Sequence, residues 1–341
     1  MIHQFSYARA TSIDDADRRL AEPGAVALGG GTDLMVCIRE ALARPRTLVD
    51  LTRIPEGRGI TRLDDGGLRI GGAVRVAQLA RDPQVRERFP ALAEACESVG
   101  TPALRTMGTI AGNLCQRPRC WYFRSGVSCH KSGGSSCPAA AESGENQYLA
   151  ILGGGPCYIV HPSDVAVALT ALEAEVEVRG GASGAGDAGG VSGASAAAES
   201  VRRVSIADFY VLPRERMDHE TVLGAGEYVS AIEIPGSSAG GVQFYEKVMQ
   251  RAGWDFALVS LAAARREDGT VRLVLGGVAP KPWRVASSVE EDVASGGLSE
   301  DDIATLAERA LYDARPLSRN GYKVGVAAGV LRRGIARVAQ G

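Results

Sequence analysis

The chain has 341 residues, of which 45% are hydrophobic and 23% charged, and its formal net charge is −2. This composition is that of a globular protein with room for two or three domains. The small net charge gives no electrostatic reason for a nucleic-acid partner. No apolar run approaches the roughly 20 residues that span a bilayer, so no membrane insertion is expected. The N-terminus lacks the pattern of a signal peptide, which predicts a cytoplasmic location.

Residues 1–57 are predicted to form a first α/β unit. Strand, helix, strand, helix and strand follow one another in the segments FSYARA, IDDADRRLAE, AVAL, GGGTDLMVCIRE and RTLVDL. Ser12 has the position of an N-cap for the first helix, and Thr32 or Asp33 for the second. The unit is expected to end near Pro55, Glu56 and Gly57.

Two further regions are predicted, at residues 58–236 and 237–341. The second region mixes strands and helices and contains a low-complexity loop at 180–200, which has almost no large apolar side chains and is expected to be disordered. The third region is expected to form three antiparallel strands followed by helices, one of which opens with Ser299 and Glu300.

Three loops have the composition of a ligand site. GGGTDL follows a strand and precedes a helix, and glycines there bring backbone N–H groups close to a phosphate. It is neither G-x-G-x-x-G nor a Walker loop, so a plain tight turn is an alternative. Residues 106–114 form a second small-residue loop, and His161 to Asp164 form a third, in which Ser163 or Asp164 is also an N-cap candidate.

Seven cysteines, an odd number, argue against a disulfide framework in a chain without a signal. Cys37 and Cys96 lie in apolar helical patterns and are expected to be buried and reduced. The other five lie between residues 115 and 157 with the spacing C-x4-C-x8-C-x7-C-x19-C. This spacing has no paired zinc knuckles and no bacterial ferredoxin pattern. The cysteine spacing alone is therefore compatible with a zinc site, with an iron–sulfur cluster and with unliganded thiols.

The whole chain resembles one family: the FAD-binding (medium) subunits of the molybdenum hydroxylases, the xanthine dehydrogenase family. The matching words, in order, are GGGTDL, LRIGGAVRVAQLA, MGTIAGNL, HPSDVAVALTAL, ADFY, EIP, KVMQRAGWDFALVS and LGGVAPKPWR. The resemblance implies an α+β fold, with a vanillyl-alcohol-oxidase (PCMH) type FAD-binding domain in two α/β subdomains. A C-terminal domain like that of the carbon monoxide dehydrogenase flavoprotein, with a three-stranded sheet and helices, is expected to follow.

The resemblance also implies which residues bind FAD. Asp164 matches a position that contacts the ribityl chain, and Val229 and Lys247 match positions that line the isoalloxazine ring. A lysine there would stabilise negative charge on the reduced flavin, although a solvated strand lysine is the alternative for Lys247. Ala111 stands where glycine is common, which requires a negative φ. The full set is Ala27, Leu28, Gly29, Gly30, Gly31, Thr32, Asp33, Leu34, Val99, Thr109, Ala111, Gly112, Asn113, Asp164, Val229 and Lys247.

The cysteine segment resembles an insertion found in one branch of the family. QRPRCWYFR is similar to the FAD subunits of periplasmic aldehyde oxidoreductases, and the segment also resembles the beta subunit of 4-hydroxybenzoyl-CoA reductase. That branch holds a [4Fe-4S] cluster in this insertion, here residues 115–157. The match implies the ligands Cys120, Cys129, Cys137 and Cys157, and leaves Cys115 as a buried residue that is not a ligand.

The function implied is that of an electron-transfer flavoprotein subunit with no catalytic residue of its own. The expected partners are a molybdopterin-binding large subunit, which oxidises an aldehyde, a heterocycle or an aryl-CoA, and a small [2Fe-2S] subunit, in a heterotrimer or its dimer. FAD would pass electrons to an acceptor such as NAD, O2 or ferredoxin. Export with a signal-bearing partner is an alternative location. A stand-alone flavoenzyme of the vanillyl-alcohol-oxidase type is the alternative function.

Overall fold

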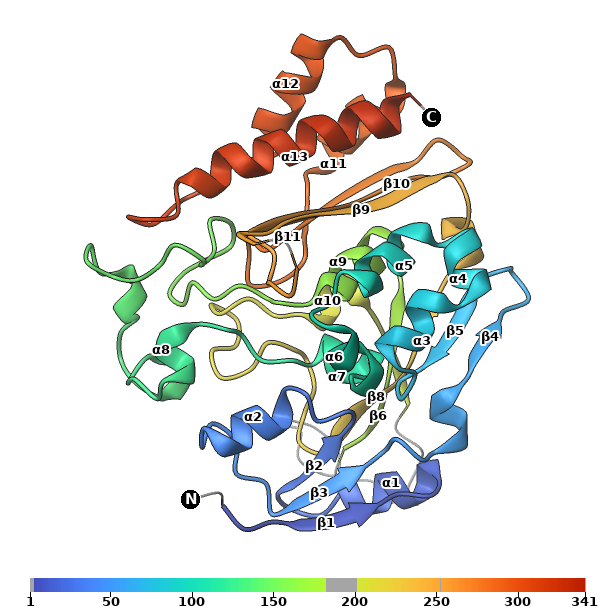
Figure 1. Ribbon diagram of the computed structural model, residues 1–341, viewed down its shortest axis with the longest axis vertical. Helices are drawn as coiled ribbons and strands as arrows, with labels where there is room; N and C mark the ends of the chain where they lie inside the picture. The colour runs from blue at the N-terminus through green and yellow to red at the C-terminus, as the bar shows by residue number, and fades with distance from the viewer. Residues whose placement is uncertain (1–2, 182–200, 252, 341) are drawn as a thin grey trace, which may run out of the picture.

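The computed structural model describes residues 3–181, 201–251 and 253–340. The low-complexity loop predicted at 180–200 lies, from residue 182 onward, outside the described residues. The chain forms three layers along its longest axis, each built on its own sheet (Figure 1). The N-terminal sheet lies at one end, and the sheet nearest the C-terminus, covered by the last helices, lies at the other.

The first sheet is parallel and has the order β1-β3-β2, with strands β1 (Ser6–Arg9), β2 (Ala25–Leu28) and β3 (Thr47–Asp50). Parallel neighbours need a crossover connection, and helices α1 (Ile13–Leu20) and α2 (Leu34–Arg39) lie within these crossovers. The predicted element order is therefore confirmed. The Ser12 side chain accepts a hydrogen bond from the Asp15 N–H at 3.1 Å, which confirms the predicted N-cap.

The second sheet is antiparallel and has the order β4-β5-β8-β6-β7. Its strands are β4 (Ile60–Arg62), β5 (Leu68–Gly71), β6 (Glu175–Gly180), β7 (Arg202–Ser205) and β8 (Glu227–Ile234). The helices of this layer are α3 (Val76–Arg81), α4 (Pro83–Arg88), α5 (Pro90–Glu97), α6 (Pro102–Met107), α7 (Ile110–Leu114), α9 (Asp164–Ala171) and α10 (Ile206–Phe209). All eight residues of α9 are buried, so this helix runs through the core rather than over it.

The third sheet has the order β12-β11-β10-β9, with β9 (Val242–Val248), β10 (Val259–Arg265), β11 (Val271–Gly276) and β12 (Trp283–Arg284). The sequence predicts only three of these strands. It misses β12 because two prolines precede it and proline disfavours a sheet interior, yet Trp283 and Arg284 pair with the edge of β11. Helices α11 (Ser287–Ser295) and α13 (Tyr322–Ala339) cover this sheet, and α12 (Glu300–Arg309) packs against these two helices (Figure 1).

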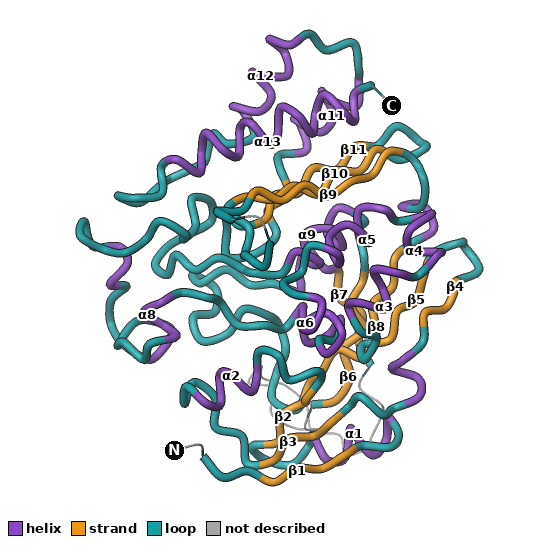
Figure 2. Tube along the Cα trace, in the orientation of Figure 1, coloured by secondary structure: helices purple, strands orange, loops and turns teal. Residues whose placement is uncertain are grey.

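The cysteine insertion is mostly loop, as Figure 2 shows, and it lies beside the layers between α2 and α13. Its regular elements are α8 (Trp121–Arg124) and the 3-10 turns η2 (His130–Ser132) and η3 (Pro138–Ala140). Two other 3-10 turns, η1 (Pro55–Arg58) and η4 (Gly236–Ser238), lie outside the insertion. Within the described residues, no helix is both long enough and apolar enough to cross a membrane.

Candidate functional site

A cavity of about 820 Å³ opens between the first two layers, a size typical of sites for cofactors and small ligands. Its wall includes both glycine-containing loops and part of β8. The predicted flavin residues on this wall are Ala27, Gly29, Gly30, Gly31, Thr32, Asp33, Leu34, Thr109, Ala111, Gly112 and Val229. The structure thus brings segments from residues 27–34, 109–112 and 229 to one space.

The two loops meet backbone to backbone at this cavity. A Cβ atom on Gly30 would overlap the Met107 carbonyl oxygen, and one on Gly29 would overlap Thr109 Oγ1. Thr109 is the N-cap of α7, and its Oγ1 accepts a hydrogen bond from the Gly112 N–H at 3.1 Å. Glycine is therefore required here for close approach between loops, and the backbone of the first loop stays open to the cavity.

Ala111 lies within α7, so its backbone is helical and the alanine causes no strain. Two residues later, Asn113 Oδ1 accepts a hydrogen bond from Ser163 Oγ at 2.6 Å. Ser163 Oγ also accepts from the Ala166 N–H at 3.0 Å, which makes Ser163 the N-cap of α9, one of its two predicted roles. The second and third predicted loops are thus joined by a direct hydrogen bond.

Asp164 and Lys247 form a buried ion pair beside these loops. Lys247 Nζ lies 2.8 Å from Asp164 Oδ2 and also donates to the Ser98 carbonyl at 3.0 Å, while Tyr245 donates its hydroxyl to Asp164 Oδ1 at 2.6 Å. The Lys247 side chain is 4% exposed, so it is not a solvated strand lysine. Burial raises the pKa of Asp164 above its ordinary value, although Lys247 and Tyr245 oppose the rise.

The remaining predicted flavin residues are spread more widely. Val99 is half-buried and packs on the core of the second layer, next to the Ser98 carbonyl that Lys247 contacts. Val229 lines the large cavity, whereas Lys247 is paired with Asp164, which lines a second cavity. Leu28 belongs to β2 and precedes the glycine loop. Val229 and Asp164, the partner of Lys247, thus line different cavities.

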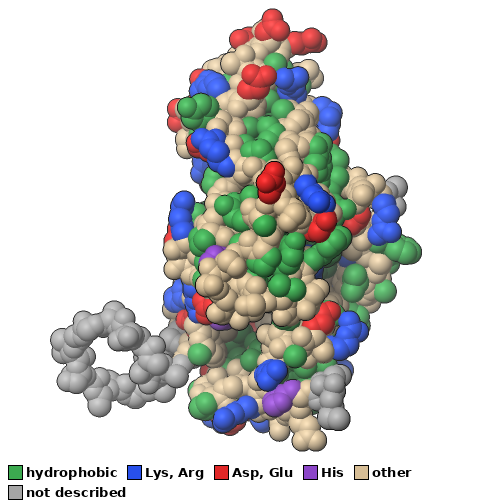
Figure 3. All heavy atoms as spheres, turned by 90° about the vertical axis from the view of Figure 1, so that its left-hand side faces the viewer, with side chains coloured by type: hydrophobic (Ala, Val, Ile, Leu, Met, Phe, Trp, Pro, Cys, Tyr) green, Lys and Arg blue, Asp and Glu red, His purple; other side chains and the backbone are tan. Residues whose placement is uncertain are grey.

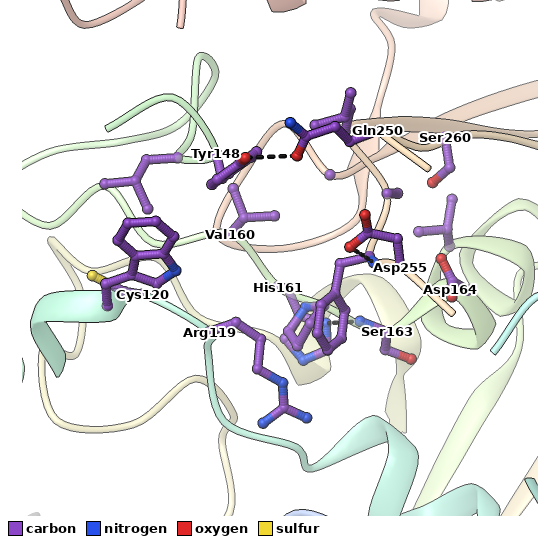
Figure 4. Close-up of a pocket in the computed structure, with 18 of the residues that line it drawn as sticks. Arg119, Cys120, Tyr148, Val160, His161, Ser163, Asp164, Gln250, Asp255 and Ser260 are labelled. Atoms are coloured by element: carbon purple, nitrogen blue, oxygen red, sulfur yellow. Dashed lines mark hydrogen bonds between the residues drawn. The ribbon is translucent and has the colours of Figure 1, made fainter. Parts of the chain in front are cut away.

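The second cavity has a volume of about 300 Å³ and lies between the insertion and the third sheet (Figure 4). Arg119 and Cys120 line it on the side of the insertion, and Asp164 and Ser260 on the opposite side. His161 lies in its wall, 4.4 Å from the Tyr210 ring centre to centre. Burial lowers the pKa of His161 to about 3, so the imidazole is neutral and does not act as an acid near neutral pH.

Three of the four predicted cluster ligands begin short helical turns. Cys120 is the N-cap residue of α8, Cys129 of η2 and Cys137 of η3. The N-terminal end of a helical turn favours a negative charge, which is the charge of a ligating thiolate. Ser132 Oγ also lies 3.5 Å from Cys129 Sγ. The fourth, Cys157, is buried and follows the insertion's last turn.

All seven cysteines are free thiols. Burial raises the pKa of Cys120, and the charges of Cys137 and Cys129 raise it further; burial raises the pKa of Cys157 to about 12, with Cys137 and Cys120 adding to the rise. These thiols therefore share one electrostatic neighbourhood. Within the described residues, however, no three metal-binding side chains lie close enough together to hold an ion, so the structure does not gather the predicted ligands into a closed set.

The sequence analysis missed the ionic contacts of the insertion. The Asp33 carboxylate makes no capping hydrogen bond to its own helix; it binds Arg119, Arg124 at 2.9 Å and the Arg117 N–H at 2.7 Å. Burial opposes ionisation of Asp33, but these partners outweigh it and lower its pKa. The three arginines between residues 117 and 124 could have indicated these contacts, because so many cations close together require acidic partners.

Several known proteins are similar to this chain over nearly its whole length. A sequence model of the family described as "FAD binding domain in molybdopterin dehydrogenase" matches residues 3–186. The aldehyde oxidoreductase FAD-binding subunit PaoB of Escherichia coli (strain K12) is 35% identical over 331 residues, covering 94% of this chain and 93% of that protein. The glyceraldehyde dehydrogenase medium chain of Sulfolobus acidocaldarius is 27% identical, covering 92% and 90%.

Solved structures have the same fold. Carbon monoxide dehydrogenase from Hydrogenophaga pseudoflava superposes with a TM-score of 0.71 at 22% identity, over 99% of this chain and 98% of the matched chain. Quinoline 2-oxidoreductase from Pseudomonas putida 86 gives 0.70 at 23% identity, over 100% and 98%. The expected fold class is confirmed. With the family model covering more than half of its length, the chain belongs to the FAD-binding medium subunits of the molybdenum hydroxylases, a family of oxidoreductases.

Proposed function

We propose that this chain binds FAD and a [4Fe-4S] cluster and transfers electrons within a molybdenum-hydroxylase-type complex. The observation that carries the proposal is the backbone-to-backbone meeting of the two glycine-containing loops at the 820 Å³ cavity. Because a Cβ at Gly29 or Gly30 would break that contact, the loop keeps bare backbone facing the cavity, which suits a pyrophosphate. The cavity and its loops therefore fit FAD.

In this proposal the chain's own residues bind and orient the flavin. Residues 27–34 and 109–113 hold the pyrophosphate, and Val229 and Val99 contribute apolar surface. Asp164 and Lys247, fixed by Tyr245 and Ser98, present a charged pair whose lysine favours negative charge nearby. Bound FAD supplies the capacity to accept electrons singly and release them in pairs.

The four predicted cysteine ligands have the chemistry that an iron–sulfur cluster requires. Three of the four cysteines stand at the N-terminal ends of helical turns, and the four thiols occupy one electrostatic neighbourhood. We propose that Cys120, Cys129, Cys137 and Cys157 close around the cluster when it is assembled, with Cys115 outside the set. Cys120 and Asp164, which this proposal assigns to the cluster and to the flavin, both line the cavity of about 300 Å³.

The relatives are named as medium chains or FAD-binding subunits, which supports a partner with the substrate chemistry. We propose a molybdopterin-binding large subunit and a [2Fe-2S] small subunit, with aldehyde oxidation in the large subunit, since the relative at 35% identity is an aldehyde oxidoreductase subunit. NAD, O2 and ferredoxin are the proposed acceptors.

Figure 3 shows the face that carries the insertion, with hydrophobic side chains gathered across its middle. Trp121, Tyr148 and Phe256 are exposed near the second cavity and suit a protein contact.

Anaerobic purification with visible and EPR spectra, flavin content and iron and sulfide analysis tests the cofactors. The expected result is one flavin and about four irons per chain, the content of a [4Fe-4S] cluster. Cys129→Ser is expected to lose the iron, whereas the matched variant Cys115→Ser keeps it. Flavin bands without iron in the wild-type chain would refute the cluster.

Co-purification tests the complex. A tagged chain is expected to bring down two partner subunits, with molybdenum in the large one. A lone chain that oxidises a substrate with its own flavin would instead support the alternative, a stand-alone flavoenzyme of the vanillyl-alcohol-oxidase type.

A further inference from the structure

The ion cluster around Asp33 links the glycine loop to the cysteine insertion. We propose that Asp33 is a positioning residue that couples flavin retention by the loop to cluster retention by the insertion, an inference that rests on the proposed function. In this arrangement each cofactor strengthens the binding of the other, and Asp33 is the contact through which they do so.

The geometry of Asp33 is unusual for its place in the chain. It is the N-cap residue of α2, yet its side chain makes no capping hydrogen bond to the helix backbone; within α2 it contacts only the Cys37 thiol, at 3.9 Å. Its Oδ2 accepts from the Arg117 N–H at 2.7 Å, and its Oδ1 binds Arg119 and Arg124. All three partners lie more than 80 residues further along the chain. The carboxylate thus holds the insertion instead of capping its own helix.

Arg124, one of the arginines that bind Asp33, also closes the turn that contains Cys120. Arg124 donates from Nε to the Pro118 carbonyl at 2.8 Å and from Nη2 to the Arg117 carbonyl at 3.0 Å. Arg124 Nη1 also lies 3.1 Å from Cys37 Sγ on α2. These contacts hold residues 117–124 to one another and to α2. A displacement of Asp33 therefore displaces Cys120.

The ion cluster also stands between the two cavities. Asp33 and Arg117 line the larger cavity, and Arg119 and Cys120 line the smaller one. The side chains of Asp33 and Arg124 are only 12% and 13% exposed, so separating them leaves charges in a poorly solvated place. A ligand that orders residues 29–34 thereby favours the ordered form of the Cys120 turn. Because coupling free energies are reciprocal, a cluster on Cys120 must favour flavin binding equally.

Asp15 provides a matched control. Like Asp33, it lies near a helix N-terminus and accepts from two arginines and one backbone N–H, namely Arg18 at 2.8 Å, Arg19 at 2.9 Å and Thr11 at 3.2 Å. Its partners all lie within four residues, so Asp15 joins no distant segments.

The experiment measures the FAD dissociation constant of cluster-loaded chain and of cluster-free chain made as Cys129→Ser. In the wild-type background the loaded form is expected to bind FAD on the order of tenfold more tightly. In the Asp33→Asn background this ratio is expected to fall to about one, and in the Asp15→Asn background to stay at the wild-type value. An Asp33→Asn ratio equal to the wild-type ratio would overturn the proposal, whatever the absolute affinities.

Limited proteolysis of cluster-free chain supplies a second readout. Added FAD is expected to protect residues 117–131 in the wild-type and Asp15→Asn chains but not in Asp33→Asn. Equal protection in all three would overturn the coupling. If the wild-type chain binds FAD but assembles no iron, the cluster of the proposed function fails, and the protection of 117–131 still decides the role of Asp33. A chain that binds no FAD overturns both.

Discussion

Lys247 on β9 and Asp164 at the start of α9 form an ion pair of 2.8 Å in which the side chains are 4% and 7% exposed. The pair joins the third sheet to the central buried helix and places two charges where water cannot solvate them. Such a pair contributes little net stability against an apolar substitute, but its disruption leaves one buried charge unpaired. Asp164 also lines the second cavity, and we propose that the pair serves the site there besides joining two layers.

Replacing Lys247 with Met is expected to destabilise the chain by about 3–5 kcal/mol at neutral pH, because Asp164 then has no cation. Burial raises the folded pKa of Asp164 above its unfolded value, so its ionisation costs stability as pH rises through that window. The variant raises this folded pKa further, so its defect should shrink as pH falls from neutral through the raised pKa, which lies above the ordinary aspartate value of about 4. Urea unfolding across pH checks this, and Lys247→Met with Asp164→Asn should recover most of the loss. A defect independent of pH would contradict this account.

Lys323 on α13 is fully buried and donates to three carbonyl oxygens, of Tyr148, Leu149 and Gly277. Burial lowers its pKa to about 7. The folded chain then binds fewer protons than the unfolded chain between pH 7 and 10.5, so stability should rise with pH there, by up to ~1.4 kcal/mol per pH unit.

Lys323→Met should abolish this rise in unfolding free energy between pH 7 and 9. The control Lys281→Met removes a partly exposed lysine that donates to the Ala207 carbonyl, and it should keep the rise. An unchanged slope in Lys323→Met would assign the pH dependence to other groups.

Gly30→Ala is expected to abolish flavin binding. The added methyl would overlap the Met107 carbonyl oxygen and force the two loops apart, and the obstacle is backbone that cannot rotate away. Gly325→Ala is the matched control, because nothing lies within 4 Å of its Cβ and it sits inside α13. That variant should keep its flavin and gain about 0.5–1 kcal/mol in unfolding free energy. Flavin absorbance per chain after gel filtration distinguishes the two, and full flavin content in Gly30→Ala would refute the role of the contact.

Ser163→Ala should cost more stability than Ser299→Ala, although both remove an N-cap. Ser299 caps the exposed start of α12, and its loss should cost about 1 kcal/mol. Ser163 is 2% exposed and also donates to Asn113 Oδ1, so its removal leaves that oxygen without its partner and should add about 1–3 kcal/mol. Thermal unfolding of both variants measures the difference. Equal losses in unfolding free energy would show that the Asn113 contact contributes no measurable stability.

Local patterns made much of the fold predictable. The alternation of strands and helices through residue 50, the N-caps at Ser12 and Ser299, and the strands β9, β10 and β11 follow from short-range propensity and hydrophobic period. Strand β12 was not predicted, because two prolines precede it and its two residues pair only with β11. The contact of Gly30 with Met107 was not predictable either, since no local sequence pattern indicates a neighbour 77 positions away.

By itself the sequence determined the family, the order of elements and the residue types at the site, because glycine loops and cysteines keep their chemistry wherever the chain places them. Only the tertiary structure decided how they are grouped. It paired Lys247 with Asp164, joined Asp33 to Arg119 and Arg124, and placed Cys120 on the cavity that Asp164 also lines. The physical reason is that buried charges must find partners, and for Asp33 the partners lie more than 80 residues away.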